Sequence, residues 1–78
     1  MLWINNTEKE KPELDEKYKG TEYKFSVEVI VHTKIGFTFV SFWDFKEECW
    51  WDESTRISDS EVMFWCRIPK LPKIIGKK

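Results

Sequence analysis

The sequence predicts a small, mainly β domain (β or α+β) with one antiparallel sheet of about four to five short strands. Two stretches on either side of Gly36 are rich in β-branched and aromatic residues and alternate with period two, which is typical of strands. Two shorter runs of the same kind follow, at 49–51 and 62–68. Five Trp, six Phe and two Tyr in 78 residues supply the large side chains that a thin core needs. A single domain over residues 1–78 is therefore expected.

The central element is a hairpin over residues 25–45. Lys34, Ile35 and Gly36 fit its short loop, with Gly36 in the left-handed conformation. Because side chains alternate between the two faces of a sheet, the odd-numbered residues of both strands form the core face. The pairs expected across the hairpin are Val31 with Phe39, Val29 with Ser41, Val27 with Trp43 and Phe25 with Phe45, and a bulge at Gly36 would shift them by one residue.

The opposite face of this hairpin is half apolar. It carries Ser26, Glu28, Ile30, His32, Thr38, Val40, Phe42 and Asp44. Ile30, Val40 and Phe42 make this face more hydrophobic than a freely solvated sheet face. The sequence therefore predicts that something covers it: the segment 12–20, the C-terminal tail, or another subunit.

The residues before the hairpin are mostly polar. Leu2-Trp3-Ile4 is long enough for an edge strand or for an anchor that places Trp3 in the core. Residues 5–24 form a polar loop or short helix. Within them, Pro12 suits a first helical turn, acidic residues and then lysines follow it, and Gly20 ends the pattern. A short helix near residues 12–19 is predicted, with a mobile loop as the alternative, because two turns are not stable alone.

The second half of the chain predicts two further strands separated by a polar loop. Lys46-Glu47-Glu48 is a turn, residues 49–51 are the third strand, and 52–60 are the loop. The strand at 62–68 ends at Pro69, because proline cannot donate to a ladder. By parity this strand places Val62, Phe64, Cys66 and Ile68 on one face. Residues 69–78 are expected to form an extended Pro/Lys tail, either as a P-x-x-P ligand or as a strap on an aromatic side chain.

Charge and cysteine content restrict the classes of function. A net charge of −1 disfavours a protein whose whole surface follows nucleic acid. The charge is uneven, since residues 44–61 hold seven acids and two bases whereas 62–78 hold five bases and no acid. This pattern indicates solvated faces, or docking of protomers head to tail. With no signal peptide, no apolar run of about 20 residues and only two cysteines, a cytoplasmic protein with reduced thiols and no membrane contact is expected.

No catalytic, metal or cofactor site is predicted. Cys49, Cys66 and His32 lack the paired ligand spacing of a zinc site, and both cysteines are interpreted as small apolar fillers beside tryptophans. His32 falls on the face away from the core whereas Cys66 falls by parity in the core, so the two do not make a nucleophile–base pair. The carboxylates between Asp44 and Glu53 lack calcium-loop spacing and indicate a solvated acidic loop. The chain is therefore expected not to be an enzyme.

The tryptophans are the strongest indication of a binding role. Trp50 and Trp51 are adjacent in a strand, so they point to opposite faces of the sheet. An exposed tryptophan can stack on a base or nucleotide, grip a proline-rich peptide or anchor a subunit interface. The alternative is that the fold buries both faces. The candidate binding residues are Phe42, Trp43, Trp50, Trp51 and Arg67.

Several short motifs together resemble a known family. They are Trp3-Ile4, Pro12, Val29-Ile30-Val31, Gly36, the tryptophan at 50 or 51, and the run Val62-Met63-Phe64-Trp65-Cys66-Arg67-Ile68-Pro69-Lys70-Leu71-Pro72. This pattern resembles the phage and prophage domain called domain of unknown function 551, and it spans nearly the whole chain. The family usually has a His before the tryptophan of the last run and Met-Pro after it. Phe64, Cys66 and Arg67 stand there in this chain, so no role of that histidine is carried over.

The segment between Pro12 and Val27 is also longer than the family pattern implies. The family has no established activity, so the resemblance implies a small β domain from a bacteriophage or prophage and no mechanism. The function expected is a small non-enzymatic accessory protein that acts in the host cytoplasm as a homo-oligomer. It would counteract host defence by blocking a host protein or by sequestering a small nucleotide-like signalling molecule. The alternatives are a self-assembling structural module, or a single-stranded nucleic-acid binder using exposed Trp and C-terminal Lys, which the nearly neutral charge disfavours.

Overall fold

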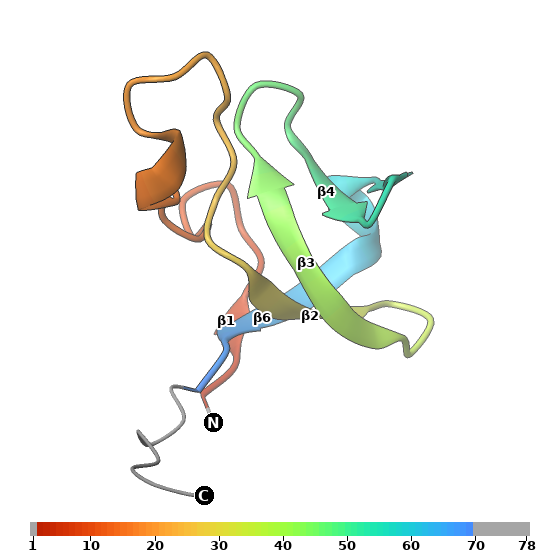
Figure 1. Cartoon of the computed structure of the whole chain (residues 1–78). Helices are drawn as coiled ribbons and strands as arrows, with labels where there is room; N and C mark the ends of the chain where they lie inside the picture. The colour runs from red at the N-terminus through yellow and green to blue at the C-terminus, as the bar shows by residue number, and fades with distance from the viewer. Residues whose placement is uncertain (1, 70–78) are drawn as a thin grey trace, which may run out of the picture.

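The computed structural model describes residues 2–69, and within them the chain folds into one six-stranded antiparallel sheet with 3₁₀ turns and no α-helix (Figure 1). The strands are β1 (Ile4–Asn5), β2 (Val29–Thr33), β3 (Thr38–Asp44), β4 (Cys49–Asp52), β5 (Thr55–Ile57) and β6 (Val62–Arg67), and the 3₁₀ turns are η1 (Glu16–Tyr18) and η2 (Asp59–Glu61). Their order in the sheet is β1-β6-β2-β3-β4-β5. The predicted fold class is confirmed, with one strand more than expected.

The central hairpin is formed by β2 and β3. Val29 pairs with Ser41 and Val31 with Phe39, as predicted, and Gly36 has a positive φ of 94° in the loop. Further along, Phe25 pairs with Asp44 and not with Phe45, so that part of the predicted register is wrong by one residue. The cause is a side chain. The Trp43 N–H donates to Ser26 Oγ at 2.8 Å, so a hydroxyl takes the place of a backbone carbonyl and the ladder becomes irregular.

The predicted polar loop over 52–60 is wrong, because it contains β5 and η2. Asp52 pairs with Thr55 across a two-residue turn in which Glu53 has a φ of 56°. β5 is an edge strand in which Thr55 and Arg56 are exposed and Ile57 alone packs against the core, so the sequence shows no hydrophobic alternation there. The β4 strand beside it matches the third strand that the sequence predicts.

A bulge in β6 changes which of its side chains face the core. Val62 lies opposite Thr33, whereas Phe64 lies opposite His32, so Met63 is an extra residue in the ladder. The side-chain parity therefore reverses within the strand. Val62 and Trp65 belong to the buried core cluster, and the predicted common face of Val62, Phe64, Cys66 and Ile68 is wrong.

The predicted helix near 12–19 is wrong: only the single turn η1 forms there. Residues 13–15 are extended instead and pair with the chain just before β2. The Val27 N–H donates to Glu13 O, and the Asp15 N–H donates to Phe25 O, both at 2.9 Å. Asp15 then caps η1 by accepting from the Lys17 N–H at 3.1 Å. Hydrogen bonds to a neighbouring extended segment thus outweigh a helical pattern that has only two turns.

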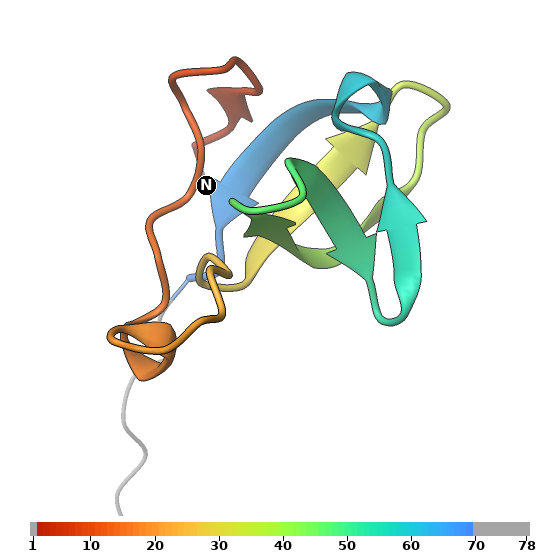
Figure 2. The same cartoon turned by 90° about the horizontal axis from the view of Figure 1, so that it is seen from above.

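The core lies on one face of the sheet, here called the inner face. It consists of Val29, Val31, Trp43, Trp50, Val62 and Trp65. Residues 6–15, here called the strap, run along the side of the twisted sheet (Figure 2) and close this face. The Trp65 Nε1–H donates to Glu10 O at 2.7 Å, and Pro12 is fully buried. The opposite side of the sheet is called the outer face below. Apart from Pro69, the predicted tail 69–78 lies outside the described residues.

Candidate binding groove and the outer sheet face

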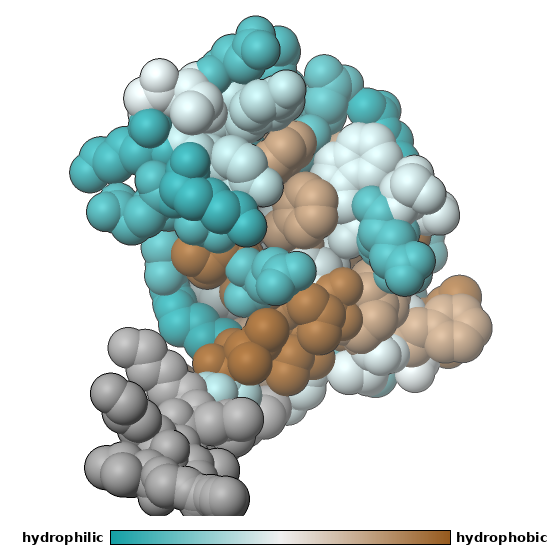
Figure 3. Space-filling view, viewed as in Figure 1, coloured by the Kyte–Doolittle hydropathy of each residue, from teal (hydrophilic) through white to brown (hydrophobic). Residues whose placement is uncertain are grey.

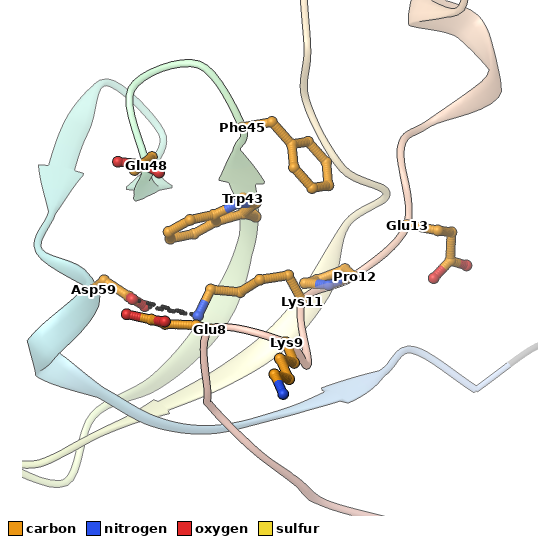
Figure 4. Close-up of a pocket in the computed structure, with 9 residues that line it drawn as sticks. All are labelled: Glu8, Lys9, Lys11, Pro12, Glu13, Trp43, Phe45, Glu48 and Asp59. Carbon is orange, nitrogen blue, oxygen red and sulfur yellow. Dashed lines mark hydrogen bonds and ion pairs between the residues drawn. The ribbon is translucent and has the colours of Figure 1, made fainter.

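A groove of about 750 Å³ lies between the strap and the β3–β4 hairpin (Figure 4). Its lining residues are Glu8, Lys9, Lys11, Pro12, Glu13, Trp43, Phe45, Glu48 and Asp59. Trp43 is buried beneath the groove, whereas the Phe45 side chain is 40% exposed. The Lys11 side chain crosses from the strap toward Asp59, below the Trp43 ring (Figure 4). The groove therefore combines aromatic surface with charged groups from the strap and the hairpin.

Lys11 joins the strap to the rest of the sheet. Its Nζ donates to Asn6 Oδ1 at 2.7 Å and to Asp59 Oδ2 at 3.3 Å, and it also lies 4.7 Å from the centre of the Trp43 ring. Only 9% of the Lys11 side chain is exposed. Burial of a cation costs desolvation free energy, and these hydrogen bonds and the aromatic ring offset that cost. Lys11 is thus a structural cation, held by contacts within the fold.

Asp59 receives hydrogen bonds from three residues, two in the strap and one in β4. The Trp50 Nε1–H donates to Asp59 Oδ1 at 2.9 Å and the Asn6 Nδ2–H to the same oxygen at 2.8 Å, in addition to Lys11. Partial burial would raise the pKa of Asp59. The hydrogen bonds from Asn6 and Trp50 and the charge of Lys11 outweigh that effect and hold the pKa below its ordinary value of 3.8. The carboxylate is therefore ionised at neutral pH and ties β4 and η2 to the strap.

The outer face leaves apolar side chains in contact with solvent. Ile30 and Val40 lie opposite each other in β2 and β3, and Val40 is 49% exposed. Figure 3 shows hydrophobic side chains gathered over the region where β2, β3 and β6 cross in Figure 1. At one side of this face the rings of Trp3, His32 and Phe64 are neighbours, with centroids 6.3 and 6.5 Å apart. The half-apolar face that the sequence predicts is thus present and partly exposed.

The five predicted binding residues do not come together in one site. Trp43 lies under the groove and Trp50 is 0% exposed in the core. Phe42 and Trp51 are cross-strand neighbours, and the Trp51 Nε1–H donates to Asp44 Oδ2 at 3.1 Å. Arg67 is exposed and its Nη2 donates to Glu13 Oε1 at 2.6 Å, so it lies at the edge of the groove.

Sequence reasoning did not identify Lys11, Asp59 or Phe45 as residues of a site, and it gave no weight to the hairpin tip. Lys11 and Asp59 stand in charged segments that carry no local signal of their pairing. Ile35 and Phe37 are 72% and 62% exposed at the tip. Large apolar residues at a turn, where polar residues are usual, are a signal that could have been used.

The two cysteines and His32 are the other groups that could take part in chemistry. Cys49 and Cys66 are free and buried, and burial raises the pKa of both thiols. His32 Nδ1 lies 2.8 Å from Thr38 Oγ1. Within residues 2–69, no three His, Cys, Asp or Glu side chains are arranged to hold a metal ion. In the same part of the chain, no helix is long and apolar enough to cross a membrane.

Comparison with known protein families, with curated proteins and with solved structures finds no match for this chain.

Proposed function

We propose that this chain is a small, non-enzymatic accessory binding protein that acts as a homo-oligomer, with the outer face of the sheet joining two copies. The single observation that carries this proposal is the exposed apolar patch at the centre of that face. Val40 is 49% exposed although it lies in β3, one of the two middle strands of the sheet. A solvated sheet face normally carries polar residues at such positions.

Within residues 2–69, the contacts of the chain with its own outer face include a cover at one end. The Phe25 ring lies 5.1 Å from the Phe42 ring and 5.2 Å from the Tyr18 ring, centroid to centroid. These contacts shield the Phe42 end of the face. The strap lies on the inner face, where it contacts Trp43 and Trp65. Within the described residues, Val40 is therefore left without a cover.

A second copy of the chain can cover this patch, because it presents an apolar sheet face of the same kind. Two sheets pack face to face about 10 Å apart, with their apolar side chains interdigitated. A twofold pair uses the same patch on both subunits, so an apolar patch is complementary to itself. A stable interface needs about 800 Å² from each partner. That area is roughly one seventh of this molecule's 6010 Å² surface.

The chemistry of the side chains supports a role without catalysis. Both thiols are buried with raised pKa values, which favours the unreactive protonated form. His32, the sole histidine, lies beside Thr38 Oγ1 on the outer face. The resemblance of the run 62–72 to a phage and prophage domain supports action in the host cytoplasm. There the protein would block a host protein or sequester a small nucleotide-like molecule.

The oligomeric state tests this proposal directly. Sedimentation equilibrium at tens of micromolar should show dimers of the wild-type chain and monomers of Val40→Glu, because a buried unpaired carboxylate is costly at an interface. Phe37→Glu is the matched control, since Phe37 is apolar and 62% exposed but lies at the hairpin tip. It should remain dimeric. A wild-type chain that stays monomeric under these conditions would remove the proposal.

A further inference from the structure

The groove in Figure 4 has properties that the outer face does not share. Its volume of about 750 Å³ lies within the ordinary range of ligand sites. Phe45 is 40% exposed on one side of the groove, whereas Pro12 and Trp43 line it from buried positions below. The strap makes one wall of the groove and the β3–β4 hairpin makes the other, so the groove runs between two chain segments. Such a site suits an extended peptide.

The charge of the groove selects a basic ligand. Its lining residues include four acids, Glu8, Glu13, Glu48 and Asp59, and two bases, Lys9 and Lys11. Lys11 is bonded to Asp59 and to two other acceptors of the fold, so it is neutralised in place. Glu8 and Glu48 make no ion pair with any residue in 2–69. An acidic excess beside aromatic surface fits a peptide that carries both lysine and apolar side chains.

Residues 70–78 of this chain have that composition. They read Lys-Leu-Pro-Lys-Ile-Ile-Gly-Lys-Lys, with four lysines, three large aliphatic residues and no acid. They follow Arg67 by two intervening residues, and the Arg67 guanidinium binds Glu13, which lines the groove. Nine residues can span about 30 Å when extended. The segment therefore begins near the rim of the groove and is long enough to follow it.

We propose that this groove is a binding site for a basic, apolar peptide and that its resident ligand is residues 70–78 of the same chain. A tethered ligand meets its site at an effective concentration in the millimolar range, so weak individual contacts are sufficient. The lysines approach Glu8 and Glu48, and the aliphatic side chains lie against Phe45. The inference is independent of the outer face and of the proposed dimer.

Paramagnetic labelling of the full chain tests this inference. Both native thiols are buried, so Lys77→Cys provides an accessible thiol for a spin label. In ¹⁵N–¹H spectra the label should broaden the amide signals of Phe45, Glu48 and Glu8, and it should leave the signal of Thr55 on β5 sharp. The broadening should weaken at high salt, because exposed charges are screened. Excess synthetic peptide of sequence 70–78 should also reduce it by competition.

Two charge reversals decide whether the groove is responsible. Glu8→Lys with Glu48→Lys alters exposed residues of the groove, and Lys73→Glu alters the segment instead. Each should reduce the broadening of the Phe45 amide to that of Thr55, while the dispersion of the spectrum reports that the fold is intact. The inference is overturned if the unmodified groove shows no broadening. It is also overturned if broadening occurs only between a spin-labelled chain and a separate ¹⁵N-labelled chain, since the ligand would then come from another copy.

Discussion

The two faces of this sheet differ in how their apolar side chains are covered. The inner face is closed by the strap, and each strong polar group there has a partner: Lys11 and Asp59 bind each other, and Trp50 and Trp65 donate their indole N–H groups. Among residues 2–69, the outer face has no such closure at its centre, where Val40 is half exposed. The difference teaches that the buried core cluster is concentrated on one face, whereas the centre of the other face contributes little burial within the described residues.

The largest expected effect is on the inner face. Trp65→Ala should lower the free energy of unfolding by about 3–5 kcal/mol, because the ring is 1% exposed and its N–H is bonded to Glu10 O. A domain of 78 residues has roughly 4–12 kcal/mol in all. Urea unfolding followed by circular dichroism measures the loss. Trp3→Ala on the 42% exposed outer ring is the control and should cost far less. Equal losses would abolish the distinction between the faces.

A second expected effect concerns the polar closure of the inner face. Lys11→Met should lower the free energy of unfolding by about 1.5–3 kcal/mol, the range for hydrogen bonds to charged groups. Methionine keeps most of the side chain's length over Trp43 and removes the charge. Lys9→Met, at an exposed position of the same strap, should change stability by less than about 0.5 kcal/mol. A double-mutant cycle with Asp59→Asn checks the cause: additive losses would show that the Lys11–Asp59 contact does not contribute to stability.

Some features of the sheet follow from the local sequence, whereas others depend on contacts between distant residues. The β2–β3 hairpin and the β4 strand follow from local alternation, since each residue's face is fixed by its neighbours. The Met63 bulge does not, because one extra residue reverses the parity without changing the composition of the strand. The Lys11–Asp59 contact joins residues that are 48 positions apart. Neither segment has a sequence pattern from which this pairing could be predicted.

The strap shows the limit of helix signals in a short segment. Pro12 and the charges after it suit a helix, but two turns gain little free energy on their own. Pairing of residues 13–15 with the chain before β2 satisfies the same backbone groups and also buries Pro12. Of the candidate site, the apolar outer face could be predicted because it depends on periodicity alone. The groove could not, since its two walls come from segments that only the tertiary fold brings together.

The pH dependence of stability should follow Asp59. Its folded-state pKa lies below the ordinary value of 3.8, so its contribution to stability is fully present above that value. The contribution is lost as pH falls through the folded pKa. Urea titrations of the wild-type chain between about pH 6 and pH 2 should therefore show a decline that is smaller in Asp59→Asn. Glu13, whose pKa is lowered by its own backbone N–H and by Arg67, adds a decline that both proteins share. Identical slopes would mean that Asp59 is not coupled to folding.

The smallest expected effect is that of Val40→Thr, and it is compared with the same substitution at Val31 on the inner face. Val31→Thr places a hydroxyl in the core at a residue that is 0% exposed, and it should cost about 1–3 kcal/mol. Val40→Thr on the outer face should change the stability of the monomer by less than about 0.5 kcal/mol. Thermal unfolding at several protein concentrations measures both.

The concentration dependence of the Val40→Thr effect then reports on the partner. Binding to the folded state stabilises it by mass action, so a dimer through the outer face raises the melting temperature of the wild-type chain with concentration. Val40→Thr should weaken that rise, whereas Val31→Thr should lower the whole curve and leave its slope unchanged. If both variants give parallel curves, Val40 has no partner in solution. The exposed centre of the outer face would then be a tolerated feature of the monomer.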